Sequence, residues 1–189
     1  MILALDISTS ITGYTVIDSS GNVKLCKYVK LSAEKDFVRK VQLACDEISK
    51  NISEYFPAIK LLAVEENLQS FRRGFSSANT INTLARYNGA LSYAMASRLK
   101  VPLNNISVST ARKEVGIKLL KSKQTDKTTK EQVLEQVQAI MDKNRQDIQW
   151  PTRILKSGPR KGLEVLQDGC YDMADSLVIA YAALSIMKK

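Results

Sequence analysis

The chain has 189 residues, of which 44% are hydrophobic and 25% are charged, a balance typical of one soluble domain with a sizeable core. Lys and Arg outnumber Asp and Glu by 28 to 19, and the resulting net charge of +9 favours a polyanionic partner, nucleic acid first. The chain contains no histidine, which excludes His-based triads and HExxH metal sites, so any chemistry must use carboxylates, lysines or hydroxyls.

The first strand is predicted at residues 2–7, which are apolar on both alternating faces, the pattern of a strand buried in the centre of a sheet. One carboxylate, Asp6, is set into this run. Burying an unpaired carboxylate costs several kcal/mol, so we expect Asp6 at an open strand end where a cation or metal compensates its charge. Taken alone, a turn or cap role beside the hydroxyl residues at 8–10 explains Asp6 equally well.

Two further strands are predicted at residues 13–18 and 23–29, joined by the polar turn at 19–22 into an antiparallel meander with the first. Apolar side chains then recur at helical spacing, which predicts a helix that begins near Ser32 as N-cap and ends before Pro57.

Residues 59–65 read as another buried strand, apolar until Glu65 and Glu66 appear at its end. Two strands that are joined by a crossover helix run parallel in the sheet, and the connection is right-handed. This strand is therefore expected to run parallel to the first, which brings Glu65 to the same edge of the sheet as Asp6.

The next loop, at residues 67–77, carries two arginines between two phenylalanines, namely Phe71, Arg72, Arg73 and Phe75. A long helix is predicted from Ala78 to Leu99, with an apolar stripe that is interrupted by small residues such as Gly89 and Ala90. Small residues allow close approach of another helix or of a second subunit. Packing in the core explains the stripe just as well.

Pro102 ends this helix, a short fifth strand is predicted at residues 106–108, and Ser109 or Thr110 is expected to cap another helix. Seven basic residues against two acids lie between Arg112 and Lys130. One more helix is expected around the apolar stripe of Val133, Val137, Ile140 and Met141. Residues 144–169 are poorly periodic and basic, and we interpret them as a functional loop with a hairpin at 154–166.

The last predicted helix begins with Asp172 and Asp175, whose i, i+3 spacing places both carboxylates on one face. Acids in a first turn are also favoured by the helix dipole alone. Together with Asp6 and Glu65, however, they form a set that would repel itself without divalent cations. Oxygen-only ligation suits Mg²⁺ or Mn²⁺, and two such ions roughly 3.5 to 4 Å apart activate water and stabilise the leaving oxygen in phosphodiester hydrolysis.

Three cysteines that lie far apart, Cys26, Cys45 and Cys170, encode neither a disulfide framework nor a CxxC zinc site. The N-terminus lacks a basic n-region and a cleavage site, and the apolar tracts are too short to span a bilayer. We therefore expect a cytoplasmic protein without membrane association.

Three motifs, LALDISTSITGYTVID, LAVEENL and DMADSLVIAYAAL, resemble in order and spacing the acidic motifs of RuvC-like Holliday junction resolvases, within the ribonuclease H-like superfamily. The resemblance covers nearly the whole chain and implies one nuclease domain over residues 1–189. It implies that Asp6, Glu65, Asp172 and Asp175 are the catalytic, metal-binding carboxylates. Glu66 competes for the second position, but the family pattern of two apolar residues before Glu selects Glu65.

The resemblance further implies an α/β fold with a mixed five-stranded sheet flanked by helices, and a homodimer that cuts both equivalent strands of a four-way junction. Two Mg²⁺ or Mn²⁺ ions per active site are expected, and the helix at 78–99 is expected at the twofold axis. Contacts to branched DNA are expected from Phe71, Arg72, Arg73, Phe75, Arg112, Lys113, Lys127, Lys130, Arg160 and Lys161.

This sequence departs from the family in three places. Ile7, Ser8 and Thr9 follow Asp6 where the family has Pro, Gly, Ser or Thr, and Leu68 stands where a junction-inserting aromatic is often found. Residues 144–169 are longer than the corresponding family segment. A broader flap or three-way-branch nuclease, a sugar-kinase or actin-like ATPase suggested by the first motif, and a noncatalytic DNA-binding protein remain alternatives.

Overall fold

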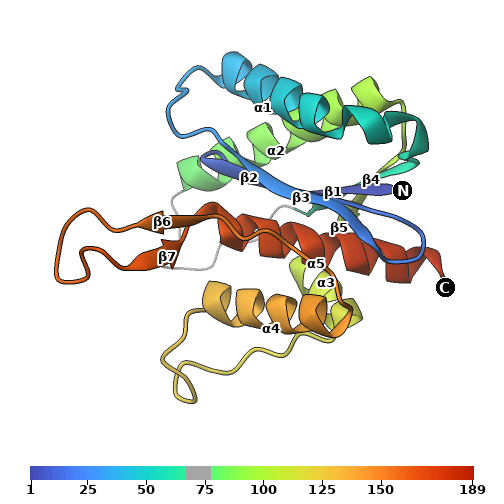
Figure 1. The fold of residues 1–189 in the computed structure, drawn as a ribbon. Helices are drawn as coiled ribbons and strands as arrows, with labels where there is room; N and C mark the ends of the chain where they lie inside the picture. The colour runs from blue at the N-terminus through green and yellow to red at the C-terminus, as the bar shows by residue number, and fades with distance from the viewer. Residues whose placement is uncertain (67–77) are drawn as a thin grey trace.

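The computed structural model describes residues 1–66 and 78–189, which form a mixed five-stranded sheet between two layers of helices (Figure 1). The strands are β1 (Ile2–Ile7), β2 (Ile11–Ile17), β3 (Val23–Lys30), β4 (Leu61–Glu65) and β5 (Leu103–Ile106). Their order in the sheet is β3-β2-β1-β4-β5; the first three strands form an antiparallel meander, and β1, β4 and β5 are parallel. The predicted α/β fold with a mixed five-stranded sheet is confirmed.

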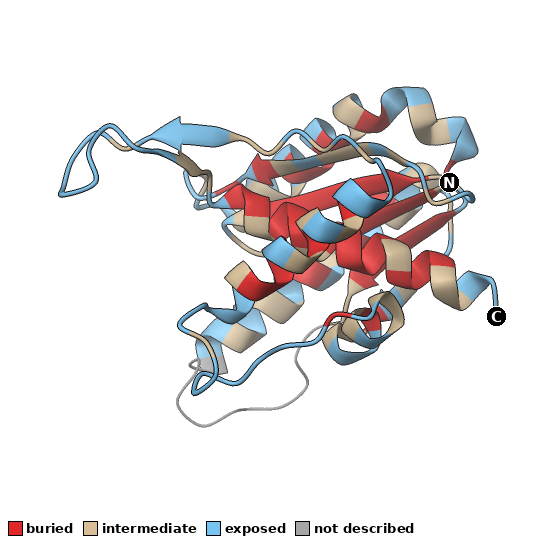
Figure 2. Cartoon of the chain, turned by 60° about the horizontal axis from the view of Figure 1, so that its bottom comes forward, coloured by how far each residue is buried: buried red, intermediate tan, exposed pale blue. Residues whose placement is uncertain are grey.

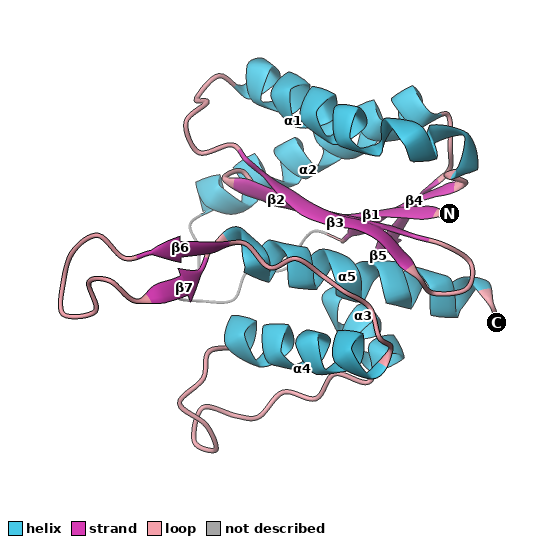
Figure 3. Cartoon of the chain, viewed as in Figure 1, coloured by secondary structure: helices cyan, strands magenta, loops and turns pink. Residues whose placement is uncertain are grey.

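Two helices, α1 (Phe37–Ile52) and α2 (Ala78–Leu99), cover one face of the sheet (Figure 3). The other face is covered by α3 (Val108–Val115), α4 (Thr129–Lys143) and α5 (Gly169–Met187). Helix α5 lies directly on the strands, and α4 packs against α5 from outside. A 3-10 helix, Ser53–Ala58, follows α1, so α1 ends before Pro57 as predicted.

Strand β1 sends alternate side chains into two separate cores, as the twofold period of a strand requires. Leu3 and Leu5 pack with α1 and α2, whereas Ile2 and Ala4 pack with α5. Asp6 follows the period of Ile2 and Ala4. Its carboxylate therefore belongs to the face that α5 covers.

Helix α5 is apolar around most of its circumference because it lies between the sheet and the outer helices (Figure 2). By length and composition α5 could also cross a membrane, but 67% of its most apolar 18 residues are buried inside the fold. Ser176 fixes α5 to the sheet through a 2.8 Å hydrogen bond between its hydroxyl and that of Thr15 on β2. Burial within a two-layer core thus accounts for the composition of this helix.

Three predicted boundaries are wrong, each for a local reason. The fifth strand ends at Ile106 and does not continue to residue 108, because Ser107 already caps α3 with its side chain. Ser107 therefore takes the place expected for Ser109 or Thr110. Helix α1 is capped by Asp36, whose carboxylate accepts from the Arg39 backbone amide at 2.8 Å, and not by Ser32.

The basic segment at residues 144–169 contains the predicted hairpin. Its strands are β6 (Thr152–Ile154) and β7 (Glu164–Leu166), which pair in antiparallel register as a separate two-stranded sheet. Figure 1 shows this hairpin projecting from the body at the end where α5 begins. The hairpin therefore leads directly into the helix that carries Asp172 and Asp175.

Candidate active site

Three elements bring the four predicted carboxylates to one region of the molecule. Asp6 lies next to the end of β1, and Glu65 is the last residue of β4. Because β1 and β4 are parallel, with Leu5 opposite Val64, the two acids leave the sheet at the same edge. Helix α5 places Asp172 in its first turn and Asp175 one turn further along, on the face of the sheet to which Asp6 points.

The electrostatics of the site show how closely the carboxylates interact. Burial raises the pKa of Asp6 well above its usual value, and repulsion from Glu65, Asp175 and Asp172 raises it further. Burial, followed by the charge of Asp175, raises the pKa of Glu65 to about 7. The pKa of Asp172 rises to about 6, and that of Asp175 is also raised, in both cases mainly by burial. Each charge therefore makes the others costlier to ionise.

Two cations border the carboxylates from the α3 and α4 side. The guanidinium of Arg112 lies 4.0 Å from the Asp175 carboxylate and lowers the pKa of both Asp175 and Glu65. Lys130, in the first turn of α4, lowers the pKa of all four carboxylates. Its ammonium lies 6.0 Å from the centre of the Tyr171 ring. These two cations only partly offset the combined effect of burial and repulsion, because the pKa values stay raised.

The donor set has the chemistry of a site for a hard divalent cation, since it consists of carboxylate oxygens alone. In the part of the chain that the structure describes, no three Asp, Glu or Cys side chains stand close enough together to hold one ion. The residual repulsion among Asp6, Glu65, Asp172 and Asp175 is nevertheless what a bound cation relieves. Carboxylate oxygens are the donor type that Mg²⁺ and Mn²⁺ prefer, but the described side chains are not spaced to hold one ion as they stand.

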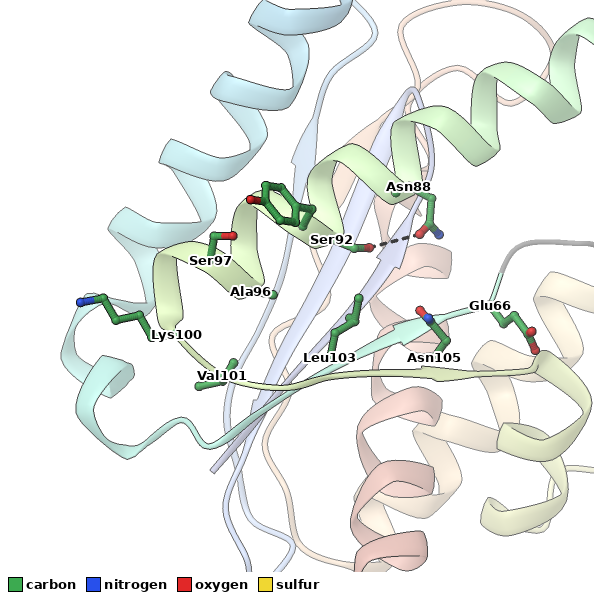
Figure 4. A pocket seen from close by; sticks show the side chains of 11 residues that line it. Glu66, Asn88, Ser92, Ala96, Ser97, Lys100, Val101, Leu103 and Asn105 are labelled. Atoms are coloured by element: carbon green, nitrogen blue, oxygen red, sulfur yellow. Dashed lines mark hydrogen bonds between the residues drawn. The ribbon is translucent and has the colours of Figure 1, made fainter.

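Glu66 belongs to a different surface from Glu65. It lines a groove of about 690 Å³ between α2 and β5, together with Asn88 and Asn105 (Figure 4). The side-chain alternation of the strand turns consecutive residues to opposite faces, so only one of the two glutamates meets the other acids. The structure thus favours Glu65 over Glu66 for the carboxylate cluster.

Two contacts that position the carboxylates involve residues that the three motifs did not single out as functional. Gly13 stands opposite Asp6 in the ladder, and an added Cβ there would lie 2.0 Å from the carbonyl oxygen of Asp172. Asn88, buried on α2, donates to the Glu65 carbonyl at 3.1 Å, and Ser92 donates to Asn88 at 3.2 Å. In the sequence, the sign of the second contact is that two polar residues, Asn88 and Ser92, stand four positions apart on one helix.

Six of the ten predicted DNA-contacting residues lie in the described part of the chain. Arg112 and Lys113 lie on α3 and Lys130 lies in the first turn of α4, whereas Lys127 precedes that helix and pairs with Glu135 at 2.7 Å. Arg160 and Lys161 lie in the loop that joins β6 to β7. The remaining four, Phe71, Arg72, Arg73 and Phe75, lie outside the described residues.

The predicted apolar stripe of α2 is only partly used inside the chain, because Ile81 and Leu84 are half-buried and belong to neither core. Leu91 and Met95 are fully buried against α1 and the sheet. The opposite side of α2 carries Gly89, Ala96 and the 74% exposed Tyr93 along the groove with β5 (Figure 4). A subunit contact on this side of the helix would therefore use the small residues and Tyr93.

The solved structures that resemble this geometry include Holliday junction resolvases. No protein-family model and no curated protein matches the chain. Thermus thermophilus RuvC in complex with a Holliday junction substrate matches with a TM-score of 0.59 and 18% identity over 96% of this chain and 93% of that one. A second Thermus thermophilus RuvC structure matches with a TM-score of 0.58 and 19% identity over 99% of this chain and 95% of that one.

The yeast mitochondrial Holliday junction resolvase Ydc2 matches with a TM-score of 0.52 and 17% identity, over 97% of this chain and 77% of the resolvase. At these identities the likeness concerns the fold. The chain has the ribonuclease H-like fold of RuvC, as its three motifs predict.

Proposed function

We propose that this chain is a divalent-metal-dependent endonuclease that resolves four-way DNA junctions by paired phosphodiester hydrolysis. The observation that carries the proposal is the convergence of Asp6, Glu65, Asp172 and Asp175 from β1, β4 and α5, in a fold shared with RuvC. One of these mutually repelling acids, Asp172, is buried and the other three are half-buried, which costs stability that structural need alone does not explain. A metal-dependent reaction does.

The four carboxylates would hold Mg²⁺ or Mn²⁺, with two ions in each active site. When bound, such ions supply an activated water and stabilise the leaving oxygen of a phosphodiester. The chain's own cations would act on the substrate. Arg112 and Lys130 stand beside the acids, where they would attract the DNA phosphate toward the carboxylates and offset its charge.

Contacts to branched DNA would come from the basic residues of α3, α4 and the β6–β7 loop. Side chains such as Lys113 and Lys130 would bind phosphates, which carry no sequence information, so selectivity would come from the shape of the junction. Phe71 or Phe75 would stack on an opened base near the crossover, which is worth about 1 to 3 kcal/mol per base. Arg72 and Arg73 would bind the adjacent backbone.

A four-way junction presents two equivalent strands, so paired cutting requires two active sites and favours a twofold homodimer. The groove between α2 and β5 is the surface that best suits this contact. Gly89 has no neighbour within 4 Å of an added Cβ, and Tyr93 is largely exposed beside it. An exposed aromatic next to small residues can fit closely against a second copy of α2.

The test is a cleavage assay of the purified protein on four-way, three-way, flap and linear DNA of matched sequence. Symmetric cutting of the four-way junction that requires Mg²⁺ or Mn²⁺ is expected. Preferential cutting of flaps or three-way branches would assign the chain to a broader branched-DNA nuclease. Metal-independent binding without any cutting would reject a catalytic role.

A further inference from the structure

The β6–β7 hairpin is an ordered arm rather than a loose connection. Beyond the paired strands, Leu155 continues the ladder by accepting from the Gly162 amide at 2.9 Å and donating to the Leu163 carbonyl at 3.0 Å. A turn closed by the Lys161 amide on the Gly158 carbonyl at 3.1 Å forms the tip. Gly158 and Gly162 both have positive φ, which a glycine adopts without strain. The tip therefore has one defined path.

The base of the hairpin is fixed to the start of α5. The side chain of Gln167 accepts from the Tyr28 hydroxyl at 2.5 Å and donates to the Thr152 carbonyl at 2.8 Å. Gly169 lies so close to the Tyr28 ring that a Cβ there would come within 2.4 Å of it. The orientation of the hairpin is thus coupled to the helix turn that carries Asp172.

The outer part of the hairpin carries positive charge without an internal partner. Lys156, Arg160 and Lys161 are exposed, and among residues 1–66 and 78–189 none of the three forms an ion pair. The hairpin's acid, Glu164, accepts from the Thr152 hydroxyl at 2.5 Å at the base, away from the tip. The charges at the tip are therefore available to an external anion.

The hairpin also exposes apolar side chains that no core of this chain requires. Ile154 is 66% exposed and Leu163 54% exposed. A two-stranded ribbon is narrow enough to enter the major groove of duplex DNA, where apolar side chains contact thymine methyl groups and basic ones contact phosphates. The hairpin therefore suits binding to duplex DNA through its cationic tip, its exposed apolar side chains and its ribbon shape.

We infer that the β6–β7 hairpin is a DNA-gripping arm that binds one duplex arm of the substrate away from the carboxylates. The inference rests on the proposed function for the identity of the substrate, and it adds a second contact at a fixed distance from the cut. Seven residues lead from Lys161 back to Asp168. At about 3.3 Å per residue, the tip reaches up to roughly 23 Å from the start of α5, which is about seven base pairs.

The test compares the wild-type chain with a triple variant, Lys156→Ala, Arg160→Ala and Lys161→Ala. A second triple variant, Lys35→Ala, Arg39→Ala and Lys50→Ala, removes the same charge near and along α1, on the opposite side of the sheet. Binding is measured against salt on junctions with loop-capped arms of about five or about 20 base pairs, and on linear duplex. Each phosphate contact contributes about 0.9 to the slope of log affinity against log salt.

The hairpin variant is expected to lose about 2 to 3 units of slope on long arms, and to bind short-armed junctions within about twofold of wild type. The α1 variant serves as the reference for an unspecific effect of net charge. Equal slopes for wild type and hairpin variant on long arms would overturn the inference, as would an equal loss in both variants.

The same experiment distinguishes a failure of the proposed function from a failure of this inference. A wild-type chain that binds DNA through the hairpin but cuts no junction would refute the nuclease and leave the gripping arm intact. A hairpin variant with an unchanged DNA slope that loses binding to polyglutamate would assign the arm to an acidic protein and overturn the inference. Wild-type protein that binds neither duplex nor junction would overturn both.

Discussion

The backbone of Gly13 lies directly against the backbone of Asp172. An added Cβ at Gly13 would come within 2.0 Å of the Asp172 carbonyl oxygen and 2.8 Å of the next amide nitrogen. Gly13 also stands opposite Asp6 in the β1–β2 ladder. The absence of a side chain at this one position allows α5 to descend onto the sheet where Asp6 leaves it, so the carboxylates of strand and helix can meet.

Gly13→Ala is therefore expected to displace the start of α5. Neither contacting atom belongs to a flexible side chain, so the helix must shift, at a cost of about 1 to 3 kcal/mol or more. The variant should have a lower melting temperature and a lower rate of junction cleavage than wild type. For unfolding of the single chain, measured below the concentration at which it dimerises, Gly89→Ala is the matched control, because nothing in the chain lies within 4 Å of its added Cβ and alanine favours helix by up to about 1 kcal/mol. Equal melting temperatures for the two variants would contradict the close approach.

The antiparallel meander and the parallel pairing of β1 with β4 could be predicted from the sequence because each rests on local pattern, and the same pattern predicts that the four carboxylates lie near one another. Apolar runs that end in Asp6 and Glu65 mark parallel strand ends, and i, i+3 spacing marks one face of α5. The contacts of Gly13 and Asn88 could not be predicted, since each depends on which backbone comes near in space. Boundaries at Ser32 and residue 108 failed because several hydroxyl or acidic residues in succession can each cap a helix.

The raised pKa of Glu65 predicts how folding stability depends on pH. Burial and the charge of Asp175 raise this pKa from 4.5 to about 7, so the folded chain holds the proton more tightly than the unfolded chain. The contribution of Glu65 to stability is thus full below about pH 4.5 and is lost as pH rises to about 7.

Glu65→Gln removes this titration. Without divalent metal, the variant should melt above wild type at about pH 8, and the difference should shrink toward about pH 4.5. Added Mg²⁺ should raise the melting temperature of wild type more than that of the variant, because a bound cation relieves the same repulsion. Scanning calorimetry over pH, with and without EDTA, checks both effects. Parallel stability curves for the two proteins would refute them.

Lys130 is expected to influence the pH below which cleavage is lost. Its ammonium lowers the pKa of all four carboxylates, so Lys130→Ala should raise these values and move the acid limb of the cleavage profile to higher pH. Lys127→Ala, which removes a nearby lysine paired with Glu135, is the control. It should leave the limb in place. A limb that moves equally in both variants would indicate a general effect of surface charge.

The α2–β5 groove is expected to mediate dimerisation. Tyr93→Arg introduces a charge at its exposed aromatic, and two such charges would face each other across a twofold axis. Sedimentation should show a dimer for wild type and a monomer for the variant at micromolar concentration, with unchanged far-UV circular dichroism. Val38→Arg, at an apolar residue of α1 that is 65% exposed, is the control. A wild-type monomer that binds a junction as one subunit would refute paired incision.

Single carboxylate replacements that separate cleavage from binding test the proposed active site most directly. Asp6→Asn, Glu65→Gln and Asp175→Asn each keep side-chain size and remove one charge from the cluster. With Mg²⁺ and a four-way junction, each variant should bind at least as tightly as wild type, since repulsion of the phosphate falls, while cleavage falls by at least about 100-fold, the scale expected when a metal ligand is lost. Cleavage by Asp6→Asn or Asp175→Asn at the wild-type rate would contradict the assignment of this site.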